Sequence, residues 1–226
     1  MVEGFDAIIV GVPALAAATR DYEALLGQPA LHSVSGNEAV VRFGLGNTTL
    51  ELRQAAAEQA VIQGLVLRDS SATRAARTVE NPLGLQIETC DGSLMAELPQ
   101  RNRVLWVDHL VLRSDNADAC VAFFAQRMGI RLALDKTVPQ WGGRMLFFRA
   151  GKLTLEVIES EREREAGSHF WGIALQHPDI AALRNQLESR AVQCSAVREG
   201  RKPGTRVASV KSHCLGIPTL LIQPAG

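Results

Sequence analysis

Short apolar stretches rich in branched side chains alternate with polar turns along most of the chain. They predict strands at 7–12, 39–43, 48–52, 110–112, 145–148, 153–158, 171–176, 207–210 and 219–222. A helix is expected after Ser114-Asp115-Asn116, which is good N-cap chemistry, and Gly129 suits its C-terminal cap. Another helix is expected from Pro178-Asp179 to Arg190. The chain therefore mixes strands with few helices.

These elements repeat. The segment Phe5–Val10 matches Val107–Leu112 at an offset of 102 residues. The pattern Gly-x-x-Thr-Leu-Glu occurs at Gly46–Glu51 and again at Gly151–Glu156, an offset of 105, and Gly64–Arg68 matches Gly172–Gln176 at 108. The matches keep the same order, so the chain divides into four modules, named here A, B, A′ and B′.

Each A module has the order β-α-β-β-β, and B′ repeats it, whereas B is shorter and is expected to be truncated. The predicted fold class is α+β with tandem βαβββ modules. We expect an N-terminal domain at 1–100 and a C-terminal domain with a complete module pair at 101–226. The two domains should superpose, with Gly46–Glu51 and Gly151–Glu156 on equivalent strands and with B lacking strands that B′ has.

The composition of the chain disfavours some classes of binding partner. Of 226 residues, 46% are hydrophobic, and 24 basic residues balance 24 acidic ones. Nucleic-acid and anionic-membrane binding are disfavoured, because both normally need a basic excess. The uncharged run Ala7–Thr19 is too short to span a bilayer, and the acidic Glu3 and Asp6 before it do not fit a signal peptide. A cytoplasmic protein is expected. The four cysteines form no Cys-x-x-Cys pair, and buried thiols are ordinary.

The stretches Val107–Leu112, Arg127–Ile130 and Gly151–Val157, with Trp171–Leu175 and Gly216–Pro218, resemble the vicinal oxygen chelate superfamily. Its members include glyoxalase I, extradiol dioxygenases, methylmalonyl-CoA epimerase and bleomycin-resistance proteins. The resemblance implies that paired modules curl into half-open β-barrels with an internal cleft. It also implies a cleft metal held by His or Gln on the first strand and Glu on the last strand of each module.

His109 and Glu156 match two of those ligand positions. An imidazole and a carboxylate on neighbouring strands could hold a divalent ion such as Zn, Fe, Mn or Ni. The counterparts in other modules are Ala7, Gly172 and the region of Leu220 and Ile222, none of which offers a ligand, although module A keeps Glu51. The ligand set is therefore incomplete, since catalytic sites usually need three or four protein ligands.

Weaker candidates surround this pair. His213 could line the cleft and bind the substrate. Either His213 or His177, which lies in a His-Pro-Asp turn, could add a metal ligand, although His177 more simply starts a helix. Trp141 in a Trp-Gly-Gly turn could cover the cleft or form a plain hairpin. Arg113 and Gln176 could bind an anionic or carbonyl ligand. The charged run Glu159–Glu165 is interpreted as a solvated linker between A′ and B′.

Two hypotheses of function remain. One is a metal-dependent lyase, isomerase or ring-cleaving dioxygenase acting on a small oxygenated molecule, in which Glu156 is a ligand or the proton-transfer base. The other is a metal-free protein that binds and sequesters a small molecule. In both, the working cleft is predicted between A′ and B′, the partner is a small molecule, and a homodimer is left open.

Overall fold

The computed structural model describes residues 1–35, 37–92, 94, 104–138, 143–160 and 167–225. Its first half forms a seven-stranded sheet with the order β2-β3-β4-β1-β5-β7-β6. The elements are β1 (Val2–Val12), α1 (Leu15–Leu26), β2 (Leu31–Ser35), β3 (Glu38–Gly44), β4 (Thr49–Gln54), β5 (Val61–Asp69), β6 (Arg77–Thr78) and β7 (Gln86–Cys90).

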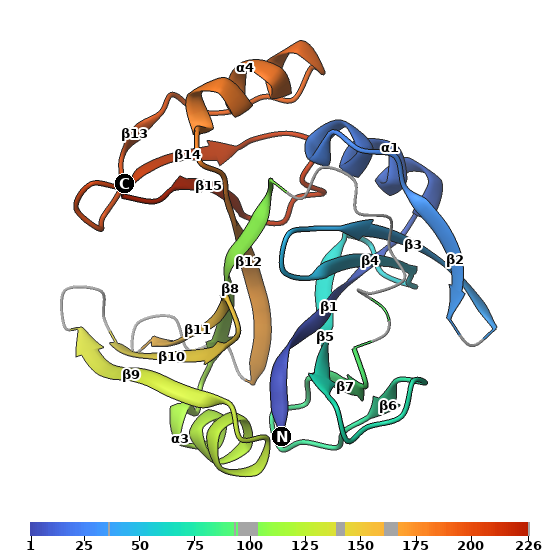
Figure 1. Cartoon of the computed structure of the whole chain (residues 1–226), viewed down its shortest axis with the longest axis vertical. Helices are drawn as coiled ribbons and strands as arrows, with labels where there is room; N and C mark the ends of the chain where they lie inside the picture. Colours follow the sequence, from blue (N-terminus) through green and yellow to red (C-terminus); the bar gives the residue numbers. More distant parts are fainter. Residues whose placement is uncertain (36, 93, 95–103, 139–142, 161–166, 226) are drawn as a thin grey trace.

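The second half forms an eight-stranded sheet with the order β13-β14-β15-β12-β8-β11-β10-β9, which curls into a half-barrel (Figure 1). Its elements are β8 (Trp106–Ser114), α3 (Ala117–Cys120), the π-helix η1 (Val121–Arg127), β9 (Arg131–Val138), β10 (Gly143–Ala150), β11 (Leu153–Ser160), β12 (Ser168–Gln176), α4 (Ile180–Ser189), β13 (Arg198–Glu199), β14 (Arg206–Val210) and β15 (Thr219–Gln223). The α+β class of tandem modules is confirmed.

The strand register confirms the sequence repeat. β4 lies parallel to β1 with Ala7 opposite Thr49, and β11 lies parallel to β8 with His109 opposite Thr154, 102 and 105 residues later. The two Gly-x-x-Thr-Leu-Glu segments therefore occupy equivalent strands. Glycine also occupies equivalent positions in the two halves, Gly64 and Gly172. A Cβ on Gly172 would lie 2.7 Å from the Pro218 carbonyl oxygen. Only glycine lets the neighbouring chain pass so closely.

Modules B and B′ differ in the elements that follow their first strands. Residues 70–76, all described, connect β5 to β6 without a helix, whereas α4 follows the equivalent strand β12. Among the described residues, B has three strands (β5, β6 and β7) and B′ has four (β12 to β15). The boundary between the two predicted domains falls within residues 95–103, outside the described part, so the division at 100 and 101 stays a prediction.

One continuous core lies between the two sheets. Ile8 and Leu65 of the first sheet and Leu110 and Leu155 of the second are all fully buried in it. Figure 1 shows β1 and β5 beside β12 and β8 at the centre of the molecule. Across this junction Asn47 both accepts a hydrogen bond from the Val107 N–H at 2.9 Å and donates one to its carbonyl oxygen at 2.7 Å.

Helices cover the core side of the second sheet. Asn116 caps α3 by accepting a hydrogen bond from the Ala119 N–H at 2.9 Å, and Asp179 caps α4 through two N–H groups, as the sequence predicts. Helix α3 continues as the π-helix η1. The spacing of apolar residues in this segment does not reveal the change from α-helix to π-helix. Phe124 of η1 packs on Phe148 of β10 with ring centroids 5.5 Å apart. The core side of this sheet is therefore closed by aromatic packing.

The charged run Glu159–Glu165 begins inside a strand. Glu159, expected in a linker, belongs to β11, and its carboxylate accepts a hydrogen bond from the Ala117 N–H at 2.8 Å. The interpretation as linker is wrong for this residue; the rest of the run, from Glu161 onward, lies outside the described residues. In the described part of the chain, no helix combines the length and the apolar character that crossing a bilayer requires.

Candidate functional site

The side of the second sheet that faces away from the core, called the inner face below, carries His109 and Glu156. Successive side chains of a strand point to opposite sides. Leu110 and Leu155, buried in the core, are register partners, so the residues next to them, His109 and Glu156, point the other way. Phe147 of β10 lies opposite Glu156 and shares this face. The sheet therefore separates an apolar side from a side that bears ionisable groups.

The two side chains approach each other on this face. The Nε2 atom of His109 lies 3.8 Å from Oε2 of Glu156, and its Nδ1 atom lies 2.8 Å from Oδ2 of Asp108. The side chains of His109 and Glu156 are 21% and 16% exposed, so each remains within reach of a small ligand. The strands β8 and β11 are neighbours, and both side chains lie on one face, which is the condition under which the sequence pairs them. Asp108, which sequence reasoning did not single out, joins them.

Burial raises the pKa of Glu156 above its ordinary value, because water no longer solvates the charged carboxylate fully. The nearby imidazole of His109 and guanidinium of Arg201 oppose the shift, and the Asp108 carboxylate adds to it. A carboxyl group with a raised pKa is suited to accepting and returning a proton near neutral pH. Such groups concentrate at functional sites.

This shift predicts a pH-dependent effect of Glu156→Gln. A carboxyl whose pKa is higher in the folded chain than in the unfolded chain destabilises the fold when it is charged. We expect Glu156→Gln to unfold at a higher temperature than wild type at neutral pH. The difference should shrink as the pH falls through the raised pKa of Glu156 and vanish below about pH 4, the range of an unfolded glutamate.

Thermal unfolding followed by circular dichroism between pH 4 and 8 measures this difference. Glu38→Gln is the matched control, since Glu38 is exposed and its replacement should change the unfolding temperature little. A Glu156→Gln protein that is less stable than wild type at pH 8 would contradict the assigned direction.

The other ligand positions implied by the family resemblance are apolar. Across the sheet, His109 pairs with Ala174, and Ala174 in turn pairs with Leu220 of β15. Gly172 has no room for a side chain. Within the described residues, no group of three or more His, Cys, Asp or Glu side chains is placed to hold a metal ion. The described donor set therefore does not fit a tightly held divalent metal, which needs at least three protein ligands.

The equivalent carboxylate of the first half is fully buried in an ion network. Glu51 accepts hydrogen bonds from Nε of Arg42 and Nε of Arg53, both at 2.6 Å, and Arg53 continues to Glu88 at 2.8 Å. Ala7 occupies the place that His109 has in the second half. The carboxylate of Glu51 is thus already paired by its own chain, whereas Glu156 faces an imidazole and remains partly exposed.

Arg113 and Gln176 are two other predicted site residues, and they lie on β8 and β12. The guanidinium of Arg113 stacks 4.7 Å above the ring of Trp171, which is 40% exposed. Gln176 is half-buried and lies opposite Trp106 and Ile222. Arg113 lies two residues after Val111, on the face of His109, so an anionic group could meet it there.

The remaining candidates are His213, His177 and Trp141, and the two histidines make local contacts. The ring of His213 contacts the Ser212 hydroxyl at 2.8 Å in its own loop, at a positive φ of 59°. His177 accepts a hydrogen bond from the Asp179 N–H at 3.0 Å, as expected of a residue that starts a helix. Trp141 lies outside the described residues. Of the sequence candidates, His109 and Glu156 are therefore the pair that the structure brings within 4 Å of each other.

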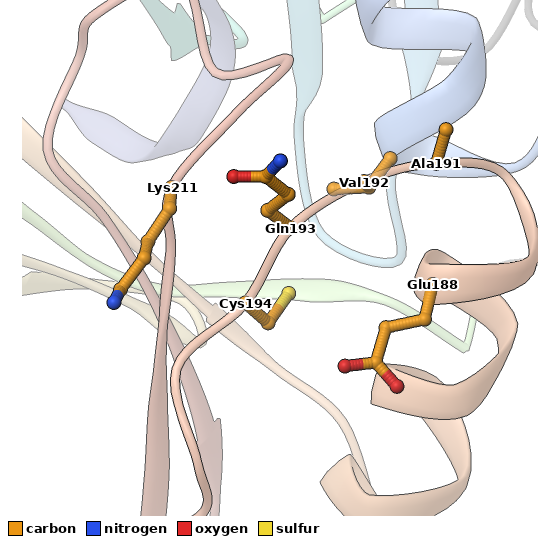
Figure 2. A pocket seen from close by; sticks show the side chains of 6 residues that line it. All are labelled: Glu188, Ala191, Val192, Gln193, Cys194 and Lys211. Carbon is orange, nitrogen blue, oxygen red and sulfur yellow. The ribbon is translucent and has the colours of Figure 1, made fainter.

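A cavity of about 520 Å³ lies elsewhere, at the C-terminal end of α4 (Figure 2). It is lined by Glu188, Ala191, Val192, Gln193, Cys194 and Lys211. Burial raises the pKa of the Cys194 thiol, which therefore stays protonated and weakly nucleophilic. In Figure 2 the Lys211 amine points away from this thiol. The cavity contains none of the predicted site residues, so the chemistry favours the inner face of the sheet.

Comparison with known proteins agrees with this fold. A search of curated proteins finds no match to the sequence. Among solved structures, a mutant of 4-hydroxymandelate synthase from Streptomyces coelicolor has a TM-score of 0.74 and 15% identity, covering 100% of this chain and 94% of that one. A fusion of a xylose isomerase-like TIM barrel with 4-hydroxyphenylpyruvate dioxygenase has a TM-score of 0.70 and 13% identity, covering 98% of this chain and 49% of that one.

At such identities the solved structures are similar to this chain in fold alone. The sequence evidence comes from the second half. Residues 106–212, which run from β8 to the loop after β14, match the family model described as Glyoxalase/Bleomycin resistance protein/Dioxygenase superfamily. That range includes both His109 and Glu156. Residues 106–212 thus carry the sequence signature of the glyoxalase, bleomycin resistance protein and dioxygenase superfamily, and the similarity in fold extends over both halves of the chain.

Proposed function

We propose that the inner face of the second half binds a small oxygenated organic molecule beside His109 and Glu156, and that Glu156 exchanges a proton with it. The observation that carries this proposal is the approach of Nε2 of His109 to Oε2 of Glu156 at 3.8 Å on a face where both remain partly exposed. A carboxyl and an imidazole at this spacing can engage two atoms of one ligand. The 4-hydroxymandelate synthase fold, similar over the whole chain, supports a small-molecule site of this type.

The chemistry follows from the groups themselves. The raised pKa of Glu156 makes its carboxylate a stronger base than an exposed glutamate, so it can remove a proton from carbon next to a carbonyl group. The C–H bond breaks, the proton moves to a carboxylate oxygen, and the electron pair is delocalised onto the carbonyl oxygen. His109 is placed to orient the Glu156 carboxyl group or a hydroxyl group of the ligand. The same carboxyl then returns a proton to carbon.

The described residues support metal-assisted chemistry less well than proton transfer by Glu156. Two described donors, with Ala174 and Leu220 across the sheet, are fewer than a tight metal site requires. We therefore place the proton transfer on Glu156 and route no step through a metal. Binding should survive dialysis against a chelator.

Hydrogen–deuterium exchange tests this function directly. Hydroxyacetone and 2-oxobutanoate, two small carbonyl compounds, are incubated with chelator-treated protein in D₂O and followed by proton NMR. We expect wild type to accelerate loss of the proton signals next to the carbonyl, and Glu156→Gln to remove that acceleration. His109→Gln should weaken it, whereas the matched exposed variants Glu38→Gln and His32→Gln should leave it unchanged.

Backbone amide shifts locate the binding. Addition of either probe should perturb β8, β11 and β12, and Glu156→Gln should reduce the perturbation. Binding without exchange would favour the alternative, a metal-free protein that sequesters its ligand. Perturbation confined to residues 2–90 would contradict both readings, since the site would then lie in the first half.

A further inference from the structure

Asp108, the residue before His109, occupies an irregular point of β8. His109 lies opposite Ala174 and Val107 lies opposite Leu175, so Asp108 is one residue more than β12 matches. In a regular strand, adjacent side chains point to opposite sides. An extra residue breaks that alternation and redirects a side chain. Here Oδ2 of Asp108 lies 2.8 Å from Nδ1 of the adjacent His109 ring.

The first half repeats this irregularity. Phe5 lies opposite Leu67 and Ala7 lies opposite Val66, so Asp6 is the extra residue of β1, 102 positions before Asp108. The Asp6 carboxylate accepts a hydrogen bond from the Cys90 thiol at 3.2 Å. The residue after Asp6 is Ala7, which has no ring for the carboxylate to contact. The bulge and its aspartate therefore belong to the module, and only the second half combines them with an imidazole.

We infer that Asp108 is a positioning residue, which accepts the Nδ1–H of His109 and thereby directs Nε2 towards Glu156 and the ligand; its functional meaning rests on the function proposed above. A neutral imidazole carries one N–H, so a proton held on Nδ1 leaves the lone pair on Nε2. That nitrogen lies 3.8 Å from Glu156 and can accept a hydrogen bond from the protonated carboxyl group or from a ligand hydroxyl group. A carboxylate behind a histidine fixes both ring orientation and tautomer.

An incidental surface ion pair would not constrain the ring in this way. Asp108 is 39% exposed, but the ring that it holds is only 21% exposed, and the opposite nitrogen of that ring faces a second carboxyl group. Turning the ring would break the 2.8 Å contact and move Nε2 away from Glu156. The bulge thus sets the orientation of the imidazole at one end, and Glu156 occupies the other.

Nitrogen-15 NMR of the imidazole ring tests this inference without any ligand. At a pH where His109 is neutral, the wild-type spectrum should show the proton on Nδ1. Asp108→Ala should shift the ring toward the Nε2–H form, whereas Asp108→Asn, which keeps an oxygen acceptor, should retain the wild-type tautomer. Asp21→Ala, on α1, is the matched control and should leave the His109 ring unchanged. Binding of 2-oxobutanoate should weaken about tenfold in Asp108→Ala, the effect of losing one hydrogen bond to a charged group.

The outcomes separate this inference from the proposed function. A wild-type ring protonated on Nε2 overturns it at once, since that tautomer cannot donate to Asp108, and this result does not depend on the alanine variant folding. An unchanged tautomer in Asp108→Ala overturns it as well. If the tautomer responds as expected but wild type neither binds nor exchanges the carbonyl probes, the function proposed for the pair fails while the positioning of His109 stands.

Discussion

Replacing Glu51 by glutamine is expected to lower the free energy of unfolding by about 3–5 kcal/mol. The carboxylate is fully buried and accepts charge-assisted hydrogen bonds at 2.6 Å from both Arg42 and Arg53. A glutamine has one acceptor oxygen and no charge, so one guanidinium would remain buried beside an amide N–H. The cost is that of an uncompensated buried charge rather than the net worth of the pair.

Urea denaturation followed by fluorescence and circular dichroism measures this loss. Glu38→Gln is again the matched control, because Glu38 is exposed on the same sheet and its replacement should change stability by less than about 0.5 kcal/mol. A loss below about 1 kcal/mol for Glu51→Gln would show that the network contributes little.

Phe124→Ala is the second large expected effect, a loss of about 3–5 kcal/mol of unfolding free energy. The ring is fully buried, and its centroid lies 5.0 Å from that of Phe123 and 5.5 Å from that of Phe148. Removing it leaves a cavity between η1 and β10 that neighbouring aromatic rings fill only in part. The same denaturation experiment measures the loss.

Phe147→Ala provides the control of the same residue type. Phe147 precedes Phe148 on β10 but points to the inner face and is only half-buried. Its truncation should cost less than half as much stability, while the probe-induced shifts near Glu156 should change. Equal losses for the two variants would contradict the division of the second sheet into a core side and an inner face.

The contrast between Glu51 and Glu156 indicates how one module served two purposes. Both follow the same Gly-x-x-Thr-Leu motif and occupy the same place in their sheets. In the first half, Arg42 and Arg53 neutralise the carboxylate and the sheet holds it as part of the fold. In the second half the carboxylate meets His109 and keeps partial exposure, which leaves it available for a ligand.

The sequence by itself determined the features that depend on local periodicity and on the repeat. Alternating apolar positions predict the strands, and the offsets of 102 and 105 predict equivalent strands in the two halves. Asn116 and Asp179 predict two helix starts, because capping depends on a few adjacent residues. The alternation of side chains also predicts that His109 shares a face with Val111 and Glu156 with Thr154, and the register of β8 and β11 then shows that these are the same face.

Only the tertiary structure decided what depends on pairing between distant segments. The ion network of Glu51 draws on Arg42, Arg53 and Glu88 from three strands, and none of these residues forms a motif in the sequence. The role of Asp108 requires the extra residue in β8, which becomes visible only against the register of β12. A strand's periodicity is a property of its own residues, whereas a bulge or a buried ion pair is defined by the partner strand, so local pattern cannot reveal it.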